Sequence, residues 1–175
     1  MPRTPPYYPM INKPEILQKR LEKLEHHYVA LREYHGLITE LKKQKDIYEP
    51  GVFGALSGYE RAVLDAYLKR YASLQDYMGA RVFPLLLESA GIAAGRMSEV
   101  LAQVEREGII DSLQDWIELR ESRNELEHDY PDGLEAALSA LMTCVSSFSK
   151  LEKYHGNIHQ FLQRNGIAVV RTAQE

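Results

Sequence analysis

Residues 12–46, NKPEILQKRLEKLEHHYVALREYHGLITELKKQKD, decide the fold class. Apolar and aromatic positions in this stretch recur at intervals of four and three residues, which is typical of one face of an α-helix. They are Leu17, Leu21, Leu24, Tyr28, Leu31, His35 and Ile38. Asn12 and Glu15 form a capping box with Pro14 in the first turn. The stretch therefore predicts one long helix that ends before Pro50.

Capping and breaking signals divide the middle of the chain in the same way. Ser57 and Glu60 form a second capping box. After it, side chains at intervals of four and three residues continue the helical pattern to about Met78. Short helices are predicted over 83–90 and 98–107, the second of them stopped by a glycine in the position that favours a left-handed backbone.

Two further helices complete the predicted fold. Asp111 is expected to cap a fifth helix, which Pro131 must end because the residue before a proline is pushed out of the helical region. A last long helix is predicted over 132–166. Helices joined by short links predict an all-α, antiparallel up-and-down bundle of about five to six helices.

Length and proline placement predict one domain. The chain has 175 residues, and four of its eight prolines lie in the first nine. We expect residues 1–12 to be an extended arm, residues 13–166 to form one helical bundle, and residues 167–175 to be a tail.

Composition excludes several classes of protein. The net charge of −4 disfavours a protein that depends on non-specific phosphate contacts. The single cysteine, Cys144, cannot form an intramolecular disulfide, which indicates a reducing compartment. No apolar run approaches the roughly 20 residues of a membrane span, and no secretory signal is visible. These features predict a cytoplasmic protein without a membrane contact.

The fifth predicted helix carries the polar residues that suggest chemistry. Leu113, Trp116, Ile117, Leu119 and Leu126 define its apolar arc. At about 100° per residue, Arg120, Arg123 and Asn124 fall within that arc and His128 falls at its edge. Because a buried charge is costly unless it is paired, the cluster is either satisfied internally or faces a cleft or another subunit.

Two interpretations of this cluster remain open on physical grounds. In the first, Arg123 pairs with Glu127 and Asn124 pairs with His128, each at a spacing of four residues. In the second, the fixed charge of Arg123, the titratable His128 and the nearby hydroxyl of Tyr130 form an active site. Arg123 and His128 lie about 140° apart around a straight helix. They could therefore act together only if the helix frays before Pro131 or if two chains supply them across a two-fold axis.

The segment 123–130, Arg-Asn-Glu-Leu-Glu-His-Asp-Tyr, resembles the Arg-x4-6-His-x-Tyr signature of HEPN-superfamily proteins of the HepT type. The wider pattern over 116–131 is similar to the same family, and so is the segment 68–84, which contains Asp76 and Gly79. The resemblance covers roughly residues 15 to 163.

The resemblance implies a function and a set of partners. HEPN proteins of this type are helical homodimers, many of them metal-independent endoribonucleases that act as toxins. A minimal nucleotidyltransferase antitoxin can silence them by adding AMP to the motif tyrosine. Carried over by position, Arg123 and His128 would be catalytic, with Asn124 and Arg120 supporting, and Tyr130 would be modified. The implied substrate is RNA, and no cofactor is implied.

A non-catalytic alternative also fits the sequence. The acidic side chains of Glu125, Glu127 and Asp129 surround the motif and oppose the approach of RNA. Some HEPN proteins are binding subunits without activity. The alternative is therefore a non-catalytic HEPN subunit that docks onto a nucleotidyltransferase.

The remaining candidates favour structural roles. His155 and His159 stand four residues apart, a spacing that can hold zinc. No HExxH pattern accompanies them, and His155 lies in the apolar stripe of its helix, so the sequence predicts no metal site. Cys144 has apolar neighbours and is expected in the core.

Overall fold

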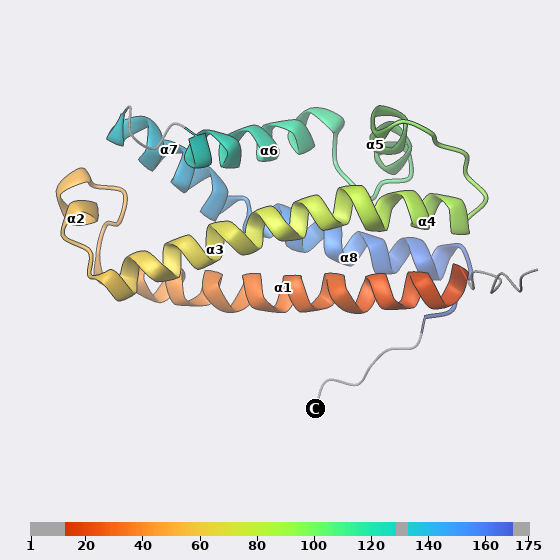
Figure 1. The fold of residues 1–175 in the computed structure, drawn as a ribbon, viewed down its shortest axis with the longest axis horizontal. Helices are drawn as coiled ribbons and strands as arrows, with labels where there is room; N and C mark the ends of the chain where they lie inside the picture. Colours follow the sequence, from red (N-terminus) through yellow and green to blue (C-terminus); the bar gives the residue numbers. More distant parts are fainter. Residues whose placement is uncertain (1–12, 129–132, 170–175) are drawn as a thin grey trace, which may run out of the picture.

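The computed structural model describes residues 13–128 and 133–169 (Figure 1). Every regular element within these ranges is a helix, which confirms the predicted all-α bundle. The elements are α1 (Lys13–Gln44), α2 (Pro50–Gly54), α3 (Gly58–Tyr77), the π-helix η1 (Met78–Val82), α4 (Phe83–Ser89), α5 (Met97–Arg106), α6 (Leu113–His128), α7 (Leu134–Ser146) and α8 (Phe148–Arg164). The predicted arm and its capping residue Asn12 lie outside the described residues.

Helix α1 forms the base of the bundle, where it packs against α3 and α8 (Figure 1). Its predicted stripe is confirmed, since every position in the stripe is buried except His35, which is half-buried. The capping box of Ser57 and Glu60 is also confirmed: each side chain accepts a hydrogen bond from the other residue's backbone N–H.

Helices α3 and α4 follow each other through a single π-helical turn, η1, with no loop between them. Pro84 lies in the first turn of α4 and has no N–H to donate, and its ring disfavours regular α-helical backbone before it. The N–H of Phe83 instead donates to the carbonyl of Met78, five residues back. The wider turn accommodates the proline and lets the helix continue.

The predicted last helix over 132–166 is wrong in one respect, because the structure divides it into α7 and α8 at Ser147. The hydroxyls of Ser146 and Ser147 both donate to the carbonyl of Thr143, at 3.1 and 2.6 Å. Serine hydroxyls that bond back to a carbonyl one turn earlier compete with the helical backbone and bend it. The chain changes direction here (Figure 1).

The remaining helices cover this base. Helix α6 contacts α3, α5 and α7, and α2 contacts α7 at one end of the molecule (Figure 1). None of the helices in the described part of the chain is long and apolar enough to cross a membrane.

Candidate functional site

Helix α6 begins differently from the expectation. Ser112, and not Asp111, caps the helix, because its Oγ accepts a hydrogen bond from the N–H of Asp115 at 2.9 Å. The carboxylate of Asp111 instead accepts from Lys153 of α8 at 2.6 Å. The cap therefore shifts by one residue, and the predicted capping residue joins α6 to α8.

Trp116 anchors α6 against the π-helical turn. A Cβ added to Gly79 would lie 3.0 Å from the indole of Trp116, tighter than an ordinary van der Waals contact, so a larger residue here would require the ring to shift. The indole also packs against Phe83, with ring centroids 5.1 Å apart. This contact fixes the position of α6 relative to α3 and α4.

The side chain of Arg123 extends from α6 to α3, and the residue is only 6% exposed. Its Nη2 donates to Oδ1 of Asp76 at 2.5 Å, and its Nη1 donates to the carbonyl of Ala72 at 2.8 Å. The Asp76 side chain is 61% exposed and that of Arg123 is 7% exposed, so the ion pair joins a buried arginine to a carboxylate at the surface. Arg123 is thus a fixed charge with two of its nitrogens already bonded within the chain.

A second polar contact between the same helices was missed by the sequence analysis. Gln75 is 1% exposed, and its Nε2 donates to the carbonyl of Trp116 at 3.1 Å. Its spacing of four residues from Tyr71 and three from Met78, both buried, could have indicated this role, because a polar residue on a buried helix face needs a partner from the facing helix.

The other motif residues do not all lie on the buried face. Arg120 and Ile117 are exposed, so the prediction that both fall within the apolar arc is wrong. Asn124 is half-buried, next to Arg123 in the sequence. Tyr130 and the side chain of His128 lie outside the described residues.

The proposed partner of Arg123 within its own helix also lies outside the described part of the chain, because the side chain of Glu127 is not described. The described partner of Arg123 is Asp76 of α3. The cluster is therefore satisfied at least in part by an ion pair between helices, a pairing that a pattern along α6 alone does not reveal.

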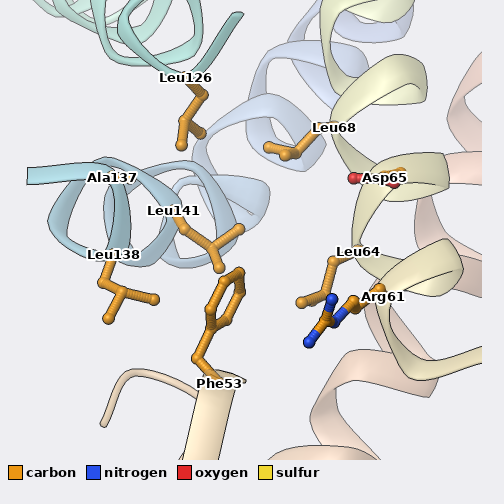
Figure 2. Close-up of a pocket in the computed structure, with 9 residues that line it drawn as sticks. All are labelled: Phe53, Arg61, Leu64, Asp65, Leu68, Leu126, Ala137, Leu138 and Leu141. Atoms are coloured by element: carbon orange, nitrogen blue, oxygen red, sulfur yellow. The ribbon is translucent and has the colours of Figure 1, made fainter. Parts of the chain in front are cut away.

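A pocket of about 80 Å³ lies beside the last turns of α6 (Figure 2). Leu126 of α6 lines it together with Leu138 and Leu141 of α7, while Arg61 and Asp65 of α3 lie at one side. Pockets that bind drug-sized ligands usually enclose about 300 Å³ or more. This pocket is therefore a gap between apolar helix faces, too small to hold a nucleotide.

A second polar cluster lies between α1 and α8. Nε2 of His155 and Oε2 of Glu25 are 2.6 Å apart, and His159 lies edge-on to His155 with ring centroids 5.0 Å apart. Burial lowers the pKa of His155, and the carboxylate of Glu25 partly opposes that effect. The sequence showed the two histidines, but only the packing of α1 on α8 brings Glu25 to them.

Cys144 is buried in the core as expected. Burial raises the pKa of its thiol to about 12, so the thiol stays protonated near neutral pH. Since the thiolate is the nucleophilic form, Cys144 does not suit nucleophilic catalysis.

Comparison of the chain with protein-family models, with curated proteins and with solved structures found no match.

Proposed function

We propose that this chain is a HEPN-type, metal-independent endoribonuclease that works as a homodimer. Its physiological role is that of a toxin neutralised by a nucleotidyltransferase, which adds AMP to Tyr130. The proposal starts from the motif residues Arg123, Asn124, His128 and Tyr130 in an all-α chain.

The observation that carries the proposal is the ion pair between Arg123 and Asp76. It joins the two segments that resemble the family. The first, 68–84, lies on α3, η1 and the start of α4, and the second, 116–131, includes most of α6. The two segments are thus in contact through one charged residue from each, Arg123 and Asp76.

The residue types fit RNA cleavage without a metal. His128 would move a proton from the ribose 2′-hydroxyl or to the leaving oxygen, because an imidazole titrates near neutral pH. Arg123 would stabilise the negative charge of the phosphorane, with Asn124 and Arg120 supporting. The expected product carries a cyclic 2′,3′-phosphate end.

The test is cleavage of RNA by the purified full chain in EDTA, after intact mass shows that Tyr130 carries no AMP. We expect His128→Ala to lower the cleavage rate by about 100-fold or more, because general acid–base catalysis contributes on that scale. His26→Ala is the matched control, since His26 is exposed on α1, and it should cleave like the wild type.

Wild-type protein that is free of AMP and yet leaves RNA intact would contradict the ribonuclease proposal. Undiminished cleavage by His128→Ala, with helicity unchanged by circular dichroism, would contradict the assignment of His128.

The second candidate is a non-catalytic HEPN subunit that docks onto a nucleotidyltransferase. The burial of Arg123 and its bonds to Asp76 and Ala72 favour it, because they leave the guanidinium little freedom to meet a phosphate. Inactive wild-type protein that co-purifies with the nucleotidyltransferase of a neighbouring gene would support this candidate over the first.

A further inference from the structure

We propose that Glu25, His155 and His159 form a zinc site that joins α1 to α8. One potential ligand atom from each residue lies within 4.8 Å of those of the other two. Glu25 comes from α1 and the two histidines from successive turns of α8. The site belongs to the base of the bundle and shares no residue with the Arg123 cluster.

The distances suit a small ion. Ligand atoms at about 2.0–2.1 Å from a tetrahedral Zn²⁺ are roughly 3.4 Å apart. In the structure Nε2 of His155 and Oε2 of Glu25 are closer than this, at 2.6 Å, because they share a hydrogen bond. The ion would replace that proton between them, and small side-chain rotations would bring His159 into place.

One of the three ligands is held in position by its surroundings. His155 is buried, and its ring stacks on Tyr28 with centroids 4.0 Å apart and planes 13° apart. Tyr28 is fixed in turn, because its hydroxyl donates to Glu152 at 2.8 Å. Such supporting contacts hold a ligand's orientation before the metal arrives, which raises metal affinity.

The other two ligands leave the site open to an ion from solvent. Glu25 and His159 are half-buried, so their side chains can adjust, and water can complete the coordination. Arg32, which lies over the Tyr28 ring at 5.6 Å, opposes a cation here, whereas Glu152 on the hydroxyl of the same tyrosine favours one.

The donor set favours a transition metal. Two imidazole nitrogens and one carboxylate oxygen suit Zn²⁺, the ion we propose, as they suit other metals that bind imidazole, whereas Mg²⁺ and Ca²⁺ require mainly oxygen ligands. A zinc ion at this place would hold the long helix α1 to the last helix of the bundle. We therefore assign the ion a stabilising role between α1 and α8, separate from the proposed RNA cleavage, although its three protein ligands and water differ from the closed four-ligand set of most structural zinc sites.

The experiment is calorimetric titration of the full chain, freed of metal with EDTA and dialysed, with ZnCl₂ and separately with MgCl₂. We expect one saturable Zn²⁺ site per chain, no response to Mg²⁺, and a thermal midpoint that rises with Zn²⁺ because the ion binds only the folded state. His159→Ala and Glu25→Gln should each weaken Zn²⁺ binding at least about 10-fold, the smallest loss usual even for supporting residues.

The matched control is His26→Ala, which removes an exposed histidine next to Glu25 and should bind Zn²⁺ like the wild type. No saturable binding would overturn the proposal. Binding that His159→Ala leaves unchanged would overturn it too, since the ion would then sit elsewhere. Zinc binding is measured without RNA, so its failure is distinguishable from failure of the ribonuclease proposal.

Discussion

At the scale of single residues, two roles compete for the guanidinium of Arg123: contact with a phosphate and the bonds it already makes within the chain. The guanidinium would serve catalysis only by meeting a phosphate, yet it already bonds Asp76 and the Ala72 carbonyl. Its burial makes an unpaired state costly. The exposed end of the pair, at Asp76, is where a phosphate could compete for the guanidinium.

Because Arg123 is buried and Asp76 is exposed, we expect substitutions of the two residues to lower stability by different amounts. Asp76→Ala leaves a buried guanidinium without its counter-charge, so we expect the free energy of unfolding to fall by about 1–3 kcal/mol. Arg123→Met removes the buried charge, keeps an apolar stem of similar length and leaves Asp76 in solvent. Its expected cost is within about 1 kcal/mol.

Urea denaturation followed by circular dichroism measures both losses. A larger loss in Arg123→Met than in Asp76→Ala would mean that the packing of the arginine stem, and not its charge, matters at this position.

At the scale of elements, a local signal placed the start of α3 correctly, but no local signal placed the division between α7 and α8. The Ser57 and Glu60 capping box lies where it was predicted, because its hydrogen bonds involve only neighbouring residues. The division of α7 from α8 was not predicted. A pair of serines bends a helix only where their hydroxyls turn back to the carbonyl of Thr143, and the sequence does not fix that choice.

The start of α3 offers a direct test of a local signal. Ser57→Ala removes the acceptor for the N–H of Glu60, and we expect the free energy of unfolding to fall by about 1 kcal/mol. Ser139→Ala is the control, because Ser139 is exposed within α7 and alanine favours helix interiors. Thermal or urea unfolding of the two variants compares them, and equal stability would exclude a role for the cap.

At the scale of the whole molecule, packing of the helices onto one another changes the protonation of histidines. Burial lowers the pKa of His35, whose ring stacks on Phe148 with centroids 4.1 Å apart. Burial also lowers the pKa of His27. Both side chains come from α1 and meet residues of other helices, so the effect exists only in the folded chain.

These shifts predict that the protein is less stable in mild acid. A histidine whose pKa is lower in the folded state binds fewer protons there than in the unfolded state. The contribution of these histidines to the free energy of unfolding is therefore fully present above their unfolded pKa of about 6.5. It decreases as the pH falls below that value. We expect a lower thermal midpoint at pH 5.5 than at pH 7.5.

Scanning calorimetry at the two pH values measures the difference. His35→Gln should reduce the difference in thermal midpoint between the two pH values. His26→Gln, which changes an exposed histidine, should leave that difference unchanged. A midpoint independent of pH over this range would show that these histidines take up protons equally well in both states.

The sequence by itself determined the fold class, the long helix α1 and the motif around Arg123, because helical period and capping depend on residues close together in the chain. The partners of the polar residues came only from the tertiary structure. Asp76 meets Arg123 across α3 and α6, and Glu25 meets His155 across α1 and α8. Contacts between residues far apart in sequence depend on how the helices pack, which no local pattern encodes.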